Sequence, residues 1–294
     1  MRILVIINPY AGNGKTLRLL PEIKRWLSQT SHEYLWRTTQ SPGEMRAEVL
    51  NAPSRQIDAI LLVGGDGTVH EALPAVRTTN LPFGLIPCGR GNDFARNVGL
   101  SLNLKSNCTI PSEPIYQEID LPTINDTPFG SIACLGFDAE VNKLAREKKG
   151  YFGGTLGYII CVIKALKGFT PFEIEIQVDD FSWKGRIMMV AIANGQFYGG
   201  GMKIAPNALI NDGQFDVCII EEVSKFELLK NFPKVFRGSH ITHPKIIMKS
   251  GKIVKIFSDE NREVFADGEY VGNIPAVCSI GDQRIRVIRT HPEF

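Results

Sequence analysis

The chain has 294 residues, of which 44% are hydrophobic and 22% are charged, and its net charge is +2. These values are near the averages for globular proteins, and they exclude a disordered chain, a collagen-like repeat and a coiled coil. At about 150 residues per domain the length suggests two domains. The weak net charge gives no general argument for nucleic-acid binding.

The first hundred residues alternate between two hydrophobic patterns. Short apolar runs predict strands over residues 2–7, 34–39, 57–63 and 83–87. Helical spacing predicts helices over residues 16–27, 42–50, 68–76 and 92–98. Because strands and helices alternate, we expect a parallel sheet with helices on its faces.

The pattern changes after about residue 110, which indicates a second, mostly β domain. Strands are predicted over residues 130–135, 172–178, 184–193, 215–221, 245–248 and 253–257, and helices over 138–149, 155–167 and 224–237. Ser250 and Gly251 predict a hairpin turn between the last two strands. No segment approaches the ~18 apolar residues of a spanning helix, so we expect a soluble protein or one attached to a membrane surface.

Three of the four early strands run directly into glycine-rich segments. These segments cover residues 8–15, 64–68 and 89–93. In an open parallel sheet the corresponding strand ends share one edge, and ligands bind there. Glycine lets a ligand approach the backbone closely, and backbone amides beside a helix N-terminus favour phosphate. The sequence therefore predicts one phosphate site made by three loops.

Two common nucleotide motifs are incomplete in these segments. Residues 12–16 end like a Walker A loop, but Pro9 stands where that motif needs its first glycine. Residues 65–67 begin like a dinucleotide fingerprint, but His70 occupies the third glycine position. The sequence therefore contains neither a complete Walker A loop nor a complete dinucleotide fingerprint.

Asp66 is an acid surrounded by the glycines of the second segment. The capping-box spacing of Thr68 and Glu71 offers a purely structural interpretation, and residues 92–93 offer another helix cap. A carboxylate among phosphate-binding amides is better explained by Mg²⁺, which would bridge it to the phosphates. We therefore favour a functional role for Asp66.

Taken together and in order, these motifs resemble the diacylglycerol kinase catalytic family, a group of soluble bacterial lipid kinases similar to sphingosine and ceramide kinases. The matching positions are residues 8–9, 12, 15, 64–68, 91–96, 194–195, 199–201, 206, 212–213 and 267–269. They cover nearly the whole chain. The Gly-Gly-Asp-Gly-Thr segment alone is shared with NAD kinases and is similar in phosphofructokinases, whereas the combination is specific.

The resemblance implies an α/β nucleotide-binding domain over residues 1–120, a β-sandwich domain over 121–285, and a segment, 286–294, that returns to the first domain. It places the active site in the cleft between the domains, where ATP with Mg²⁺ phosphorylates a lipid hydroxyl. ATP contacts are implied for Asn8, Lys15, Thr39, Gly64, Gly65, Asp66, Gly67, Thr68, Val69, His70, Arg90 and Asn92.

The resemblance also implies catalytic and metal roles. Asp66 and Asp93 would organise Mg²⁺–ATP, and Glu269 would be the general base. Without the resemblance, Glu269 would be interpreted as a solvated acid in a hairpin turn. A structural Mg²⁺ is implied at Leu209, Asp212 and Gln214, and Asp120 is implied in a network that links this ion to the cleft.

Two positions depart from the family pattern. Arg90 stands where relatives usually have threonine, and it could contact a phosphate or a neighbouring carboxylate. His70 often corresponds to asparagine, and we expect it to serve the helix rather than a substrate.

A basic segment follows later in the chain. Residues 225–255 hold eight Lys or Arg residues and one acid, with Phe226, Phe232 and Phe236 interleaved. This composition suits an anionic bilayer, and it also suits a helix that packs its phenylalanines inward. Ser224 and Glu227 predict a capping box at the start of that helix. No nucleic-acid motif accompanies the basic residues.

The sequence therefore predicts a cytoplasmic lipid kinase that contacts the membrane peripherally during catalysis. Diacylglycerol is the expected acceptor. The alternatives are a sphingoid base, a polyprenol, phosphatidylglycerol, NAD, or a non-catalytic nucleotide- or lipid-binding regulator. Residues 153–169 are expected to pack in the core rather than line an acyl-chain pocket, and a homodimer is left open.

Overall fold

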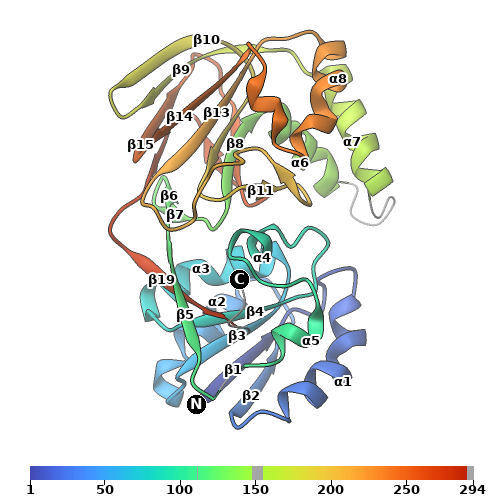
Figure 1. Ribbon diagram of the computed structural model, residues 1–294, viewed down its shortest axis with the longest axis vertical. Coiled ribbons are helices and arrows are strands. Elements are labelled where there is room, and N and C mark those ends of the chain that lie inside the picture. Colours follow the sequence, from blue (N-terminus) through green and yellow to red (C-terminus); the bar gives the residue numbers. More distant parts are fainter. Residues whose placement is uncertain (111, 148–154, 290–294) are drawn as a thin grey trace. The chain divides into compact units, whose positions relative to one another are not determined.

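The computed structural model describes residues 1–110, 112–147 and 155–289. The chain folds into two compact units (Figure 1). The N-terminal unit holds Met1–Leu121, Gly199–Gly201 and the described residues from Asp282 onward. The C-terminal unit holds Pro122–Tyr198 and Met202–Gly281. Both units are therefore built from segments that lie apart in the sequence.

The N-terminal unit is built around a mostly parallel sheet with the strand order β2-β1-β3-β4-β19-β5 (Figure 1). Its strands are β1 (Arg2–Ile7), β2 (Glu33–Thr38), β3 (Ala59–Gly64), β4 (Phe83–Pro87), β5 (Ile115–Asp120) and β19 (Arg284–Arg289). Strands β1, β3 and β4 are buried along nearly their whole length, as apolar strands covered on both faces must be. The parallel α/β sheet expected from the sequence is confirmed.

Helices cover this sheet. They are α1 (Lys15–Leu27), α2 (Glu44–Leu50), α3 (Asp66–Thr79), α4 (Asp93–Asn97) and α5 (Leu104–Asn107), with the 3-10 helix η1 (Pro53–Arg55). Ile3, Val5 and Ile7 of β1 join one buried cluster with Ile23 and Leu27 of α1. Each such fully buried side chain stabilises the fold by roughly 1.5–3 kcal/mol. The alternation of β1 thus fixes which of its side chains meet α1.

The last strand of the chain completes the N-terminal sheet. β19 runs parallel to β4 and antiparallel to β5, with Arg284 opposite Asp120. The chain re-enters this unit at Asp282, earlier than the predicted residue 286. Figure 1 shows β19 beside β5.

The C-terminal unit is an antiparallel β-sandwich. Its strands are β6 (Thr123–Ile124), β7 (Thr127–Pro128), β8 (Ile132–Gly136), β9 (Phe172–Val178), β10 (Phe181–Ala193), β11 (Phe197–Tyr198), β12 (Met202–Lys203), β13 (Phe215–Glu221), β14 (Ile246–Gly251), β15 (Ile253–Phe257), β16 (Glu263–Ala266), β17 (Glu269–Asn273) and β18 (Ala276–Ser279). Their order is β17-β16-β8-β10-β9-β15-β18-β6-β7, and β13 pairs with β10 and β14.

The helices of this unit are α6 (Phe137–Glu147), α7 (Thr155–Gly168) and α8 (Lys225–Val235), with the 3-10 helix η2 (Ser239–Thr242). One apolar core joins strands and helices, and it includes Phe169, Leu166 and Ala165 of the segment expected to pack inward. All six cysteines are buried and unpaired, as reduced core thiols. Among the described residues, no helix has the length and apolar character needed to cross a bilayer.

The hairpin predicted at Ser250 and Gly251 is wrong. β14 pairs with β13, whereas β15 pairs with β9 and β18, so the two strands are not partners. A Cβ on Gly251 would lie 2.7 Å from Val178, and the carboxylate of Asp179 accepts the backbone N–H of Ile253 at 2.9 Å. The turn therefore packs against the β9–β10 connection. The chain continues from it into β15, which pairs with β9 and β18.

The alternative interpretation of Thr68 and Glu71 as a capping box is excluded by the structure. Gly65 is the N-cap of α3, and its N–H donates to the hydroxyl of Thr68 at 3.2 Å. Glu71 instead accepts the N–H of Gly43 at 2.8 Å. Helix α3 thus begins two residues earlier than predicted, and Asp66 lies in its first turn.

Candidate active site

The three glycine segments of the N-terminal unit meet where β1, β3 and β4 end side by side. A Cβ atom on Gly65 would lie 2.8 Å from the Cα atom of Gly89, so the second and third segments touch through their backbones. A Cβ atom on Gly12 would lie 2.3 Å from the carbonyl oxygen of Cys88, so the first segment touches the residue that leads directly into the third. Only glycine allows this approach, and the structure therefore brings the three loops together.

A short hydrogen-bond network ties the first loop to the second. Asn8 Nδ2 donates to the hydroxyl of Thr68 at 3.0 Å, and Asn8 Oδ1 accepts the N–H of Tyr10 at 3.0 Å. A Cβ atom on Gly64 would lie 2.1 Å from the same Thr68 hydroxyl oxygen. Thr68 is 1% exposed. Asn8, Gly64 and Thr68 therefore shape the loops, and direct contact of their side chains with ATP stays a prediction.

Two carboxylates flank one glycine of the third loop. A Cβ atom on Gly91 would lie 3.1 Å from Oδ2 of Asp66 and 3.1 Å from Oδ2 of Asp93. Oδ1 of Asp66 accepts the N–H of Phe94 at 3.0 Å, and Oδ2 of Asp93 accepts the N–H of Gly200 at 2.7 Å. Both acids are therefore held by backbone donors and lie close to each other at the point where the loops meet.

The environment of Asp93 penalises its negative charge. Burial raises the pKa of Asp93 to about 6, the nearby charge of Asp66 adds to the rise, and the backbone N–H groups of Gly200 and Gly201 oppose it. Oδ1 of Asp93 is buried and has no hydrogen-bond partner among the described residues, with Arg96 Nε 3.9 Å away. An orphaned carboxylate oxygen beside a second carboxylate suits a hard cation that prefers oxygen ligands. The pair therefore fits Mg²⁺.

The glycine triplet at 199–201 belongs to this site. Its backbone has φ angles of 58°, 87° and 107°, which favour glycine at each position. It folds with the N-terminal unit although it lies between two strands of the C-terminal unit. Besides the hydrogen bond to Asp93, a Cβ atom on Gly201 would lie 3.6 Å from the guanidinium of Arg96. The triplet could be recognised as a motif in the sequence, but its contacts with Asp93 and Arg96 are seen only in the structure.

The other predicted ATP residues surround the loops in different ways. Lys15 is exposed at the start of α1, and exposed Arg90 donates to Oδ1 of Asn13, which ties the third loop to the first. Thr39 instead holds β2 to β1, because its hydroxyl donates to the carbonyl oxygen of Ile7 at 3.2 Å. Lys15 and Arg90 therefore offer two cations beside the loops.

Four further predicted positions lie at the start of α3 or in the third loop. Gly67 is exposed and His70 is half-buried, whereas Val69 is 2% exposed in the core. The side chain of Val69 therefore faces away from any ligand in solvent. Asn92 donates to the carbonyl oxygen of Gly89 at 3.2 Å, which closes the third loop on itself.

In the C-terminal unit, Glu269 follows a turn that is anchored by Asp267. The carboxylate of Asp267 accepts the backbone N–H groups of Gly130 at 2.7 Å, Ser131 at 2.8 Å and Ile132 at 3.3 Å. Asp267 itself has a φ angle of 51°. Glu269 is the first residue of β17, directly after this anchored turn. No local sequence pattern indicates this role of Asp267, because its partners lie more than a hundred residues away.

Replacement of Asp267 by alanine is expected to destabilise the C-terminal unit by about 3 kcal/mol, because three N–H groups lose a charged acceptor. Asparagine keeps one acceptor oxygen and tolerates a positive φ angle, so its cost should be about half as large. Urea denaturation of both variants measures the difference. An unchanged unfolding free energy for the alanine variant would show that the contacts contribute nothing.

The implied structural Mg²⁺ site has a single carboxylate. Oδ1 of Asp212 accepts the N–H of Gln214 at 3.0 Å, and Leu209 is 56% exposed. In the part of the chain that the structure describes, no three His, Cys, Asp or Glu side chains gather around a possible metal position. Asp120 is 1% exposed and pairs with Arg284 at 3.1 Å. A cation at Asp212 would depend on backbone carbonyls, and both roles stay predictions.

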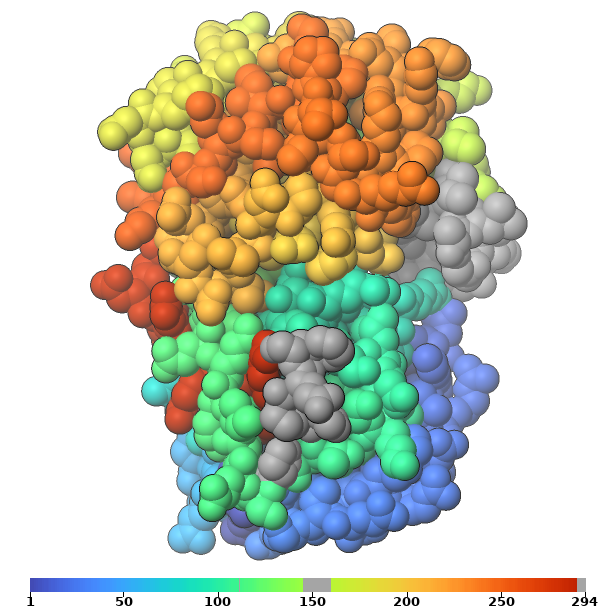
Figure 2. Space-filling model, in the orientation of Figure 1, coloured from blue at the N-terminus to red at the C-terminus, as the bar shows by residue number. Residues whose placement is uncertain are grey.

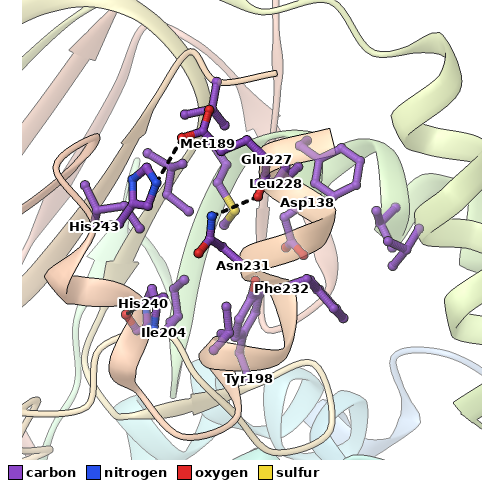
Figure 3. Close-up of a pocket in the computed structure, with 17 residues that line it drawn as sticks. Asp138, Met189, Tyr198, Ile204, Glu227, Leu228, Asn231, Phe232, His240 and His243 are labelled. Carbon is purple, nitrogen blue, oxygen red and sulfur yellow. Dashed lines mark hydrogen bonds and ion pairs between the residues drawn. The ribbon is translucent and has the colours of Figure 1, made fainter. Parts of the chain in front are cut away.

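A largely apolar pocket opens in the C-terminal unit (Figure 3). Its hollow volume is about 50 Å³. Helices α6, α7 and α8 and strands β10 and β13 contribute to its walls, and Val162 comes from the segment expected only to pack in the core. Polar groups at its border include Asp138, Asn231, His240 and His243, and Figure 3 shows the dashed contact between Glu227 and His243. This pocket was missed in the sequence because its residues come from many separate segments.

Asp138 is a buried acid at the border of this pocket. Its Oδ2 atom accepts hydrogen bonds from the Cys134 thiol at 2.9 Å and from Asn142 at 3.0 Å. Burial raises the pKa of Asp138 to about 6, although both hydrogen bonds act in the opposite direction. The folded protein therefore binds this proton more tightly than the unfolded chain does, and the associated stability is lost as the pH rises toward 6.

The Asp138→Asn variant should therefore gain stability relative to the native protein as the pH increases from about 4 to 7, by up to roughly 3 kcal/mol. The sign follows because asparagine stays neutral while the buried aspartate must ionise. Urea denaturation at several pH values measures the difference, and Asp126→Asn, at an exposed aspartate of the β6–β7 turn, is the matched control. A constant difference between Asp138→Asn and the native protein would contradict the prediction.

Comparisons with known proteins agree with this architecture. The model of the diacylglycerol kinase catalytic domain matches residues 2–124, and that of the YegS C-terminal NAD kinase beta sandwich-like domain matches residues 131–289. A diacylglycerol kinase from Bacillus subtilis (strain 168) is 30% identical over 278 residues, or 93% of this chain and 91% of the relative. One from Mycobacterium tuberculosis (strain CDC 1551 / Oshkosh) is 28% identical over 295 residues, or 98% and 95%.

The crystal structure of a diacylglycerol kinase from Bacillus anthracis (strain Sterne) has the same fold. Its TM-score is 0.77 at 22% sequence identity, and the match covers 99% of this chain and 97% of that one. The same family is indicated by the matches to both domains, by the glycine loops and by the curated relatives. The chain belongs to the diacylglycerol kinase family and is a kinase of the lipid kinase type.

Proposed function

We propose that this kinase transfers the γ-phosphoryl group of ATP to the hydroxyl of diacylglycerol and forms phosphatidic acid. The Asp66–Asp93 pair at the meeting point of three backbone loops is the observation that carries the proposal. Phosphoryl transfer depends mainly on positioning and on neutralising charge, and this arrangement supports both.

The N-terminal unit would hold the nucleotide. Backbone N–H groups of the glycine loops and the N-terminus of α3 suit the phosphates, and Lys15 and Arg90 add positive charge. Asp66 and Asp93 would hold Mg²⁺, which neutralises phosphate charge when it is bound. Tethering by Asn13 keeps Arg90 beside the first loop, so we propose that Arg90 contacts a phosphate rather than a carboxylate.

The C-terminal unit would supply the base and the acceptor site. Glu269 would take the proton of the attacking hydroxyl as its oxygen bonds to the γ-phosphorus and the bond to ADP breaks. The apolar pocket supports an acceptor with hydrocarbon chains. Because its hollow volume is only about 50 Å³, a long acyl chain would have to displace side chains of α8.

The acceptor is tested by incubating the protein with Mg²⁺–ATP and separate dispersions of diacylglycerol, sphingosine, a polyprenol and phosphatidylglycerol, and with soluble NAD. ADP release and mass spectrometry of the products are measured. We expect ADP and phosphatidic acid with diacylglycerol. Turnover with another acceptor alone would reassign the substrate, and ATP binding without ADP release in any mixture would indicate a non-catalytic binder.

A further inference from the structure

Helix α8 has two apolar faces. Its inner side chains Leu228, Phe232 and Val235 line the pocket, as Figure 3 shows for Leu228 and Phe232. Its outer side chains Phe226 and Leu229 are 78% and 43% exposed, and Phe236, directly after the helix, is 47% exposed. Residues 226, 229, 233 and 236 follow helical spacing and form one stripe. We call this stripe the outer ridge. A helix that only packed inward would not expose such a ridge.

Positive charges border the outer ridge. Lys230, Lys234 and Arg237 each follow a ridge residue directly, and all three are exposed. The acid of the helix, Glu227, lies on the inner side, where Oε1 contacts Nε2 of His243 at 3.1 Å. Figure 2 shows the segment around residues 225–237, in orange, at the surface of the C-terminal unit. The exposed side of α8 therefore combines large apolar side chains with charge of one sign.

The helix is firmly held in the C-terminal unit. Ser224 caps it, since its hydroxyl accepts the N–H of Glu227 at 3.1 Å, which is one half of the predicted capping box, whereas the carboxylate of Glu227 contacts His243. Lys225 Nζ donates to the carbonyl oxygen of Lys167 at the end of α7, at 2.8 Å. The inner face is packed, and the helix continues through Pro233 to Val235. The outer ridge is thus presented on a fixed element.

We propose that the outer ridge of α8 is the surface through which this kinase docks on an anionic lipid bilayer. Aromatic and aliphatic side chains flanked by lysine and arginine are typical of helices that lie at a membrane interface. A second copy of the chain is a poorer occupant, because a two-fold contact would bring Lys230, Lys234 and Arg237 against the same cations. The choice of a bilayer rests on the proposed lipid acceptor.

Helix α8 would then have two connected roles. Its outer face touches the lipid surface while its inner face walls the apolar pocket. Only helix α8 would therefore separate an acceptor lipid in the bilayer from the pocket. Because the hollow volume is small, movement of the α8 side chains Leu228 and Phe232 on docking would enlarge the pocket on the side of the membrane.

The test measures co-sedimentation of the full chain with phosphatidylcholine vesicles, with and without phosphatidylglycerol, in the absence of ATP. The variant Lys230→Glu/Lys234→Glu should bind the anionic vesicles at least roughly 30-fold more weakly, because two cations are lost from the surface. Lys252→Glu/Lys255→Glu reverses the same number of charges on exposed residues outside α8 and should bind normally. Equal losses in both variants, or no binding by the native protein, would overturn the proposal.

A second pair of variants tests the apolar part. Phe226→Ser/Leu229→Ser should weaken binding that persists at high salt, whereas Ile253→Ser/Val277→Ser, at exposed apolar residues of β15 and β18, should not. ADP release with a short-chain, monomeric diacylglycerol should stay normal in all four variants, which separates docking from the proposed reaction. A monomer–dimer shift caused by the ridge variants without vesicles would assign the ridge to a second copy and overturn the proposal.

Discussion

Replacement of Asp66 by asparagine is expected to lower turnover by roughly 100-fold or more, with the fold intact. The Oδ1 atom of asparagine can still accept the N–H of Phe94, so the third loop keeps its anchor. The charge beside Asp93 is lost, however, and with it half of the pair that would hold Mg²⁺. Because catalysis here depends on neutralising phosphate charge, the loss should fall on the rate rather than on folding.

A coupled assay of ADP release at saturating ATP measures this effect, and thermal unfolding checks the fold. Asp282→Asn changes an exposed aspartate of the same unit and is expected to retain normal turnover. Asp66→Asn should also lower the pKa of Asp93, because it removes the nearby negative charge that helps to raise it. A normal rate for Asp66→Asn would remove Asp66 from the machinery and with it the main support for Mg²⁺–ATP at this site.

The pair of buried Asp93 and half-buried Asp66 also shows why such a site is costly without a ligand. The raised pKa of Asp93 means that the stability of its neutral form is present below about pH 4 and is lost as the pH rises through about 6. At neutral pH the ionised Asp93 lies beside Asp66 with one oxygen unpartnered among the described residues. A cation would relieve both penalties. The acid pair therefore favours the binding of a cation, and it lowers the stability of the N-terminal unit when no ligand is bound.

Much of the N-terminal fold could be predicted because its information is local. The apolar runs of β1, β3 and β4 are buried on both sides, and a glycine segment follows each of them. Neighbouring parallel strands necessarily bring such segments to one edge, so the convergence of Gly12, Gly65 and Gly89 could be inferred without coordinates. The residue types also indicated phosphate, because glycine-rich backbone amides beside a helix N-terminus favour an anion.

Strand pairs and hydrogen-bond partners that lie far apart in the sequence could not be inferred in this way. Gly251 signals a turn, but whether β14 and β15 pair depends on which other strands are available, and β13 and β9 take those places. The carboxylate of Asp267 finds its N–H donors at 130–132 only after the sheet has formed. Glycines 199–201 were visible as a motif, yet their partner Asp93 lies in another part of the chain. In each of these three cases the feature that could not be predicted is an interaction partner that no local sequence pattern specifies.

The Glu269→Gln variant is expected to bind ATP normally and to lose turnover by about 100-fold or more, the usual contribution of a general base. Glutamine keeps the size of the side chain and the start of β17, but it cannot accept the proton of an attacking hydroxyl. The nucleotide should bind as before, because the loops proposed to hold it belong to the N-terminal unit whereas Glu269 lies in the C-terminal one.

Calorimetry of ATP binding and single-turnover ADP formation separate the two effects. Glu263→Gln makes the same change in the same hairpin, at a residue paired with Lys143 at 3.3 Å, and it should leave the rate near normal. If Glu269→Gln weakens ATP binding as much as it slows turnover, Glu269 contributes to binding rather than to proton removal. If its rate stays near that of the Glu263 control, another group must take the proton, and the resemblance has misassigned the base.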